Sequence, residues 1–166
     1  MAKSFFDVFP TLKIEQEMKV LFEDTEVTKV ATNSDRTYLH IHLSSHHLIE
    51  KKWIYKLERM IKEQLFGRNR IQVEICERYE LSELYTFGNL LQEYYDSMLL
   101  ELRKASIVVC NLFQEAEWQV LSEGKIQLEV EDTIVARGKI DFLVDYLQST
   151  FSKRFGMPIR IEVAYR

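Results

Sequence analysis

Two short blocks of sequence recur in the same order after nearly the same interval. LFEDTEV, starting at Leu21, is answered by LFQEAEW, starting at Leu112, a shift of 91 residues. FGRNRIQVEI, starting at Phe66, is answered by FGMPIRIEV, starting at Phe155, a shift of 89 residues. Because two matches in one order are hard to obtain by chance, the sequence predicts one structural unit used twice.

A β-hairpin is predicted between the two blocks of each unit. Residues 38–43 alternate between apolar and polar side chains, after a short strand near Val27 and turn residues at 33–36. Residues 126–131 alternate in the same way after a tight turn at 122–124. Alternation with a period of two is typical of a strand with one buried face. The apolar positions of these strands are Leu39, Ile41, Leu43, Ile126, Leu128 and Val130.

A helix and a final strand are predicted after each hairpin. Apolar residues recur at spacings of three and four, which indicates one buried helix face. Both helices end before a glycine, Gly67 and Gly156, where we expect a left-handed cap, and strands follow from Ile71 and Ile159. The apolar positions are Ile54, Leu57, Ile61, Leu65, Ile140, Leu143, Leu147 and Phe151.

The predicted fold class is α+β, with two α-β-β-α-β units. Each unit is expected to be a small three-stranded sheet with helices on one face. We place the boundary near Arg78, so that residues 1–78 form the first unit and residues 79–166 the second, which has a long leading helix that breaks near Ala105. The other sheet face is left to solvent or to a partner protein. In the first unit that candidate partner face carries Tyr38, His40 and His42.

The charge of the chain argues against a dedicated nucleic-acid binder, because affinity for phosphates depends on clustered lysine and arginine. The net charge is −4 and the pI is about 5.6. A local basic surface is nevertheless a candidate for nucleic-acid contact. The alternative is a solvated helix face balanced by Glu50, Glu58 and Glu63. The candidate contact residues are Lys51, Lys52, Lys56, Arg68 and Arg70.

The sequence predicts no metal site, no cofactor and no catalytic residue. The two cysteines, Cys76 and Cys110, have no C-x-x-C spacing and are expected to be reduced thiols. The histidines at 40, 42, 46 and 47 lack an organised set of partner ligands, so we expect exposed strand and loop histidines. No nucleophile elbow, P-loop or dinucleotide-binding glycine pattern occurs.

Three stretches resemble the beginning of the PolC-type DNA polymerase III α subunits of Gram-positive bacteria. They are LFEDTEVTKV, TYLHIHLSSHHLI and YELSELYTFGNLLQEYYDSMLLEL, and the resemblance covers essentially the whole chain. It implies that the first unit is N-terminal domain I, similar to the carboxy-terminal domain of the τ subunit. The second unit would be N-terminal domain II, similar to a type II KH module. The five glycines never fall at the GxxG spacing with which KH domains clamp nucleic acid.

The resemblance implies a non-catalytic part of a replicative DNA polymerase. The full-length protein would be a DNA-directed DNA polymerase with 3'-5' exonuclease activity, and its catalytic carboxylates would lie in later domains. We expect protein–protein tethering in the replisome, with the τ subunit as the candidate partner. The alternatives are an accessory single-strand or template-binding module and a freestanding structural protein.

A cytoplasmic location is expected from two features of the sequence. The longest apolar stretch, residues 107–110, is far too short to cross a bilayer. The first ten residues lack the apolar core of a signal peptide. The chain ends on a predicted strand, which suggests a piece of a longer protein.

Overall fold

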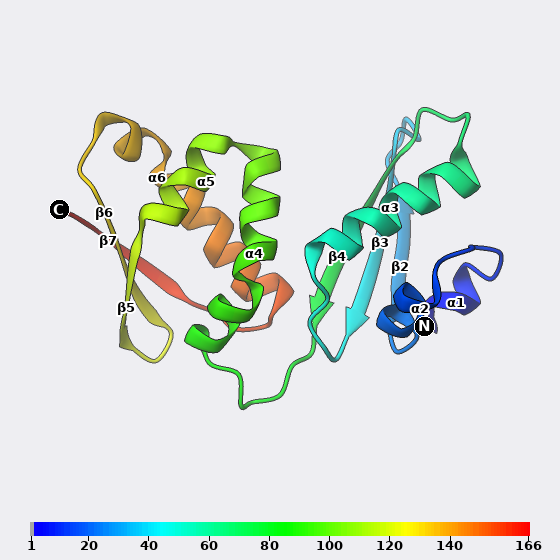
Figure 1. The fold of residues 1–166 in the computed structure, drawn as a ribbon, viewed down its shortest axis with the longest axis horizontal. Helices are drawn as coiled ribbons and strands as arrows, with labels where there is room; N and C mark the ends of the chain where they lie inside the picture. Colours follow the sequence, from blue (N-terminus) through cyan, green and yellow to red (C-terminus); the bar gives the residue numbers. More distant parts are fainter. Residues whose placement is uncertain (1) are drawn as a thin grey trace. The chain divides into compact units, whose positions relative to one another are not determined.

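The computed structural model describes residues 2–166, which form two compact units. The first unit ends at Ser82 and the second begins at Glu83. The division lies beyond the expected position at Arg78, because the last strand of the first unit continues through Tyr79. Figure 1 shows helices and a small sheet in each unit, so the predicted α+β class is confirmed.

The first unit contains a four-stranded sheet with strand order β1-β2-β3-β4. Strands β1 and β2, and β2 and β3, pair antiparallel, whereas β3 and β4 pair parallel. The strands are β1 (Lys3–Ser4), β2 (Glu26–Thr32), β3 (Tyr38–Ser45) and β4 (Gln72–Tyr79). The helices are α1 (Phe5–Val8), α2 (Gln16–Phe22) and α3 (Lys51–Phe66).

The predicted apolar positions form the core of this unit. Leu39, Ile41 and Leu43 of β3 are buried, and the alternating residues between them are more exposed. Helix α3 packs its buried face, which includes Ile54 and Leu57, on this side of the sheet (Figure 1). The predicted contribution of Leu65 is wrong, because this residue lies in the last turn of α3 and is 38% exposed.

Two details of the first unit differ from the prediction. The sheet has a fourth strand, β1, whose two residues pair with Val27 and Glu26 and are too few to show an alternating pattern. Gly67 is not in the left-handed region, because its φ is −52°. A Cβ atom at Gly67 would lie 3.0 Å from the carbonyl oxygen of Glu63. Close packing against the preceding turn therefore accounts for this glycine.

The second unit contains a three-stranded sheet with strand order β5-β6-β7. Strands β5 and β6 form the predicted hairpin, and β7 pairs parallel with β6. The strands are β5 (Glu117–Ser122), β6 (Lys125–Val130) and β7 (Arg160–Tyr165). The helices are α4 (Phe87–Ala105), α5 (Ile107–Glu115) and α6 (Ile134–Ser149), and a π-helical turn, Thr150–Arg154, extends α6.

The helix ends of the second unit follow the sequence closely. The predicted break near Ala105 is confirmed, because Ser106 has an extended backbone between α4 and α5 and its hydroxyl accepts from the Val109 amide. Thr133 caps α6 in the same way by accepting from the Ala136 amide. Gly156 has a φ of +64°, which confirms the left-handed conformation expected there.

The two units repeat one arrangement of hairpin, helix and parallel strand, as the recurring blocks predicted. Strands β2 and β3 with α3 and β4 correspond to β5 and β6 with α6 and β7. In both units a helix side chain accepts a hydrogen bond from an N–H of the last strand. Glu58 Oε2 lies 2.7 Å from the Ile75 nitrogen, and Gln148 Oε1 lies 2.9 Å from the Ile161 nitrogen. These contacts cover part of an otherwise open sheet edge.

None of the helices within residues 2–166 combines the length and apolar character that crossing a membrane requires.

Candidate functional site

The open face of the first sheet is built by two rows of paired residues. One row joins Ala31, His40 and Glu74, and the next joins Lys29, His42 and Cys76. Directly paired residues point to the same side of a sheet. Because Leu39, Ile41 and Leu43 point into the core, these rows face away from it. We call the surface formed by both rows and Tyr38 the open face.

The predicted partner residues Tyr38, His40 and His42 all lie on this open face. The rings of Tyr38 and His40 stack with a centroid distance of 6.0 Å and an interplanar angle of 14°. Tyr38 is 39% exposed, and His42 is half-buried. The structure thus places an exposed aromatic ring among polar side chains, and the role of these residues in partner binding stays a prediction.

His40 also approaches Glu74 and Cys76, which the sequence did not identify as site residues. Its Nδ1 atom lies 3.7 Å from Oε2 of Glu74. A nitrogen of His40, a carboxylate oxygen of Glu74 and the sulfur of Cys76 all lie within 4.8 Å of one another. His40 is more than 30 positions from Glu74 and Cys76 in the chain, and the three residues meet because β3 and β4 pair in parallel register. The alternation of residues 72–79 was the signal that placed Glu74 and Cys76 on one side.

The other two histidines take no part in this group. His46 is an exposed residue whose Nδ1 lies 3.9 Å from Oε2 of Glu80. His47 fixes a loop, because its Nε2 lies 3.1 Å from the carbonyl oxygen of Leu21 and its amide donates to Ser45 Oγ. The close sequence spacing of the histidines therefore does not reflect one common site.

Lys51 corrects the predicted basic surface. Its ammonium is buried and donates to both carboxylate oxygens of Glu77, at 2.9 and 3.1 Å. The side chains of Lys51 and Glu77 are only 4% and 3% exposed. A buried and paired ammonium is not available to a phosphate, so Lys51 does not belong to a nucleic-acid surface.

The remaining four basic candidates do not form one patch. Lys52 Nζ lies 3.2 Å from Glu50 Oε2, and Lys56 Nζ lies 3.4 Å from Glu15 Oε1. Both ammonium groups also lie over the Trp53 ring. Arg68 and Arg70 are exposed beyond the far end of α3, and the helix rise separates the two pairs by about 20 Å. Glu50 balances the charge of Lys52, as expected. The carboxylate of Glu58 instead accepts a hydrogen bond from the Ile75 amide of β4.

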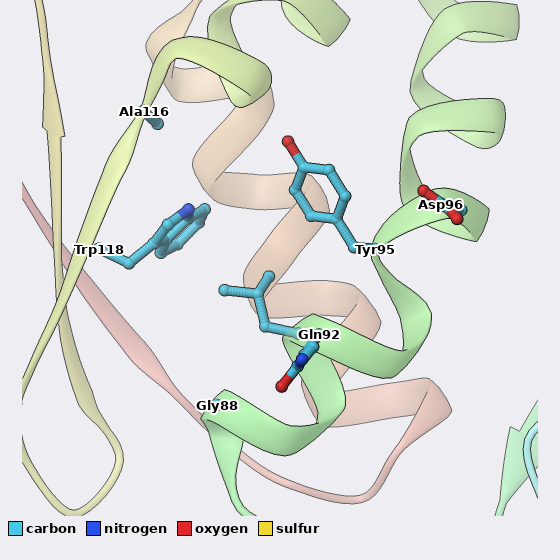
Figure 2. Close-up of a pocket in the computed structure, with 7 residues that line it drawn as sticks. Gly88, Gln92, Tyr95, Asp96, Ala116 and Trp118 are labelled. Carbon is cyan, nitrogen blue, oxygen red and sulfur yellow. The ribbon is translucent and has the colours of Figure 1, made fainter.

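A hollow of about 430 Å³ lies between α4 and β5 in the second unit. Figure 2 shows Tyr95 of α4 and Trp118 of β5 on opposite sides of it. The Tyr95 ring stacks on Phe113, and burial, followed by the charges of Cys110 and Asp96, raises the pKa of Tyr95. The hollow therefore offers a largely apolar wall, to which Asp96 adds one carboxylate. Its lining residues are Gly88, Leu91, Gln92, Tyr95, Asp96, Ala116 and Trp118.

The open face of the second sheet carries charges of both signs. Glu117 pairs with Glu129, and Gln119 pairs with Gln127, so these side chains share the face opposite the buried Leu128. Glu162 lies on the same face through its pairing with Gln127. Lys125 and Arg160 pair with each other on the same face, and Lys125 Nζ lies 3.0 Å from Glu162 Oε1, so cations offset part of the negative charge.

Comparison with known protein families gives a match in the first unit. A family model described as DNA polymerase III polC-type N-terminus I matches residues 4–75. No curated protein and no solved structure matches the chain. The matched stretch runs from the end of β1 into β4 and includes His40 and Glu74. The resemblance of the second unit to a KH module lies outside it and stays a prediction. Residues 4–75 of this chain are therefore similar to the PolC-type DNA polymerase III N-terminus I domains.

Proposed function

We propose that this chain is a non-catalytic N-terminal part of a PolC-type DNA polymerase III and tethers the polymerase to another replisome protein. The observation that carries the proposal is the open face of the matched unit. Helices cover one side of its sheet, and the other side presents Tyr38, His40 and His42. A partly exposed aromatic ring surrounded by polar groups is typical of a protein-binding surface.

The side chains of the chain support a non-catalytic role. Phosphoryl transfer by polymerases depends on carboxylates that hold two metal ions close together. Within residues 2–166, the one grouping of three potential metal ligands contains a single carboxylate, that of Glu74. Polymerase and exonuclease activities would therefore belong to other parts of the full-length protein. A replicative polymerase acts on the chromosome, so the proposal places the protein in the bacterial cytoplasm.

The τ subunit is the candidate partner, and its binding tests the open face. We expect Tyr38→Ala to weaken the affinity of the chain for purified τ by about tenfold or more, because interface tyrosines often contribute most of the binding energy. Biolayer interferometry with immobilised τ measures the dissociation constant. Phe142→Ala is a matched control, because Phe142 is an aromatic residue of the second unit that is 49% exposed.

Two results would contradict the tethering proposal in different ways. Equal affinities of the Tyr38→Ala variant and the unmodified chain would exclude the open face as the contact surface. No binding of the unmodified chain at ~50 μM would exclude τ as a partner of useful affinity. Circular dichroism of both variants checks that neither substitution unfolds the chain.

Nucleic-acid binding is the second candidate function, because Lys52 and Lys56 present two cations beside Trp53. Under the tethering proposal, fluorescence anisotropy should show no salt-sensitive binding of labelled single-stranded or primed DNA. The reason is that both lysines are paired with carboxylates and lie far from Arg68 and Arg70. Binding that falls steeply with salt and is lost in the Lys52→Glu and Arg70→Glu variants would favour the nucleic-acid module instead.

A further inference from the structure

We infer that His40, Glu74 and Cys76 form a zinc-binding site on the open face of the first sheet. The ligand atoms of the three side chains already lie within 4.8 Å of one another. His40 and Glu74 are direct partners in the pairing of β3 with β4, and Cys76 is the next residue of β4 on that face. Neighbouring strands hold the side chains more firmly than a loop would.

The chemistry of the three groups favours zinc over other divalent cations. Zinc takes imidazole nitrogen, thiolate sulfur and carboxylate oxygen, whereas magnesium and calcium require sets of oxygen ligands. Bonds of about 2.0–2.3 Å to a tetrahedral zinc ion bring ligand atoms to roughly 3.3–3.8 Å from one another. The distance from His40 Nδ1 to Glu74 Oε2 is 3.7 Å. The Cys76 sulfur lies within 4.8 Å of both atoms and supplies the third ligand.

The surroundings of the three side chains allow an ion to enter. The side chains of His40 and Glu74 are 38% and 56% exposed, and Cys76 is half-buried. The Tyr38 ring stacks with the imidazole at a centroid distance of 6.0 Å. Three protein ligands leave the fourth position of zinc to water. The site was not expected from the sequence, because only the parallel register of β3 and β4 brings the ligands together.

The pair of His46 and Glu80 in the same unit serves as an internal control. Its Nδ1 to Oε2 distance, 3.9 Å, resembles that of His40 and Glu74. Within residues 2–166, however, no third ligand joins that pair to make a potential metal site. A histidine and a carboxylate alone bind zinc weakly, so this pair should not retain the ion. The contrast isolates the contribution of the Cys76 thiolate.

Titration of the metal-free, reduced chain with Co²⁺ and then Zn²⁺ tests the site. We expect one Co²⁺ ion per chain, with a thiolate-to-cobalt charge-transfer band in the near ultraviolet that Zn²⁺ abolishes by displacement. Cys76→Ser should remove the band. His40→Gln and Glu74→Gln should each weaken zinc binding in the competition by about tenfold or more. His46→Gln should leave the affinity unchanged.

Three outcomes would overturn the inference. They are no charge-transfer band in the unmodified chain, a band that persists in Cys76→Ser, and equal loss of affinity in His46→Gln and His40→Gln. Cys110, the other thiol, is fully buried in the second unit, so a band that persists in Cys76→Ser would be assigned to it. Circular dichroism of Cys76→Ser shows whether the fold persists. The inference goes beyond tethering, because the titration needs no partner protein and its failure leaves the τ experiment unaffected.

Discussion

Replacing Lys51 with methionine is expected to destabilise the first unit by about 3–5 kcal/mol, because it removes one partner of a buried ion pair. Both carboxylate oxygens of Glu77 accept hydrogen bonds from the Lys51 ammonium. The methionine side chain is similar in length and keeps most of the apolar stem packed. The loss therefore comes mainly from the buried carboxylate of Glu77, which no longer faces the ammonium.

Urea unfolding followed by Trp53 fluorescence measures this loss. A Trp118→Phe background removes the tryptophan of the second unit, so that the signal reports the first unit. The matched control is Lys52→Met, because Lys52 is the next residue of α3 and its side chain is 60% exposed. We expect that control to change the free energy of unfolding by less than about 0.5 kcal/mol.

A double variant separates the ion pair from general packing. Lys51→Met combined with Glu77→Leu should recover most of the stability lost in the single variant, because neither charge then remains in the core. Similar losses in Lys51→Met and Lys52→Met would show that burial of the pair has no energetic consequence. No recovery in the double variant would attribute the loss to packing instead.

The burial of Lys51 was readable in the sequence, although the basic pattern led elsewhere. Residues 51, 54, 57 and 61 recur at spacings of three and four, so Lys51 lies on the apolar face of α3 with Ile54 and Leu57. Glu77 likewise lies on the same side of β4 as Ile75 and Tyr79, both of which are buried. Two opposite charges on two buried faces predict a pair. A count of the cations along α3 misses this pair, because the count does not consider which face of the helix each residue occupies.

The hairpins, helices and repeat could be predicted because burial of one face imposes a period on the sequence. Leu39, Ile41 and Leu43 show that period directly. The group of His40, Glu74 and Cys76 could not be predicted, because it depends on which residue of β4 pairs with which residue of β3. A shift of two residues would keep the buried face of each strand and would still change the partner of His40. Periodicity within each strand does not determine that register.

Replacing Glu101 with alanine is expected to destabilise the second unit by about 3 kcal/mol. This loss is near the lower end of the range for breaking a buried ion pair, because water still reaches the pair. Arg154 donates two hydrogen bonds to the Glu101 carboxylate, at 2.9 and 3.0 Å. The side chains of Arg154 and Glu101 are 17% and 19% exposed. Removing the carboxylate leaves a largely buried guanidinium without its counter-charge.

Two tyrosines extend this pair into a network. The Tyr146 hydroxyl donates to Glu101 Oε1, and Arg154 donates to the Tyr94 hydroxyl oxygen at 3.2 Å. Burial, followed by the negative charge of Glu101, raises the pKa of Tyr146 well above its usual range. Tyr146 therefore remains a donor at neutral pH, and its hydroxyl also loses an acceptor in Glu101→Ala. We expect Tyr146→Phe to cost about 1 kcal/mol, because it removes one hydrogen bond to a charged group that keeps its main partner.

Trp118 fluorescence in a Trp53→Phe background follows urea unfolding of the second unit and measures both losses. Glu93→Ala is the control, because Glu93 is an exposed residue of the same helix, and its effect should stay within about 0.5 kcal/mol. Glu101→Gln should fall between Glu101→Ala and the unmodified chain, since the amide oxygen still accepts hydrogen bonds but carries no charge. Equal stability of the Glu101→Ala and Glu93→Ala variants would contradict the prediction. It would mean that water replaces the carboxylate around Arg154 at no cost.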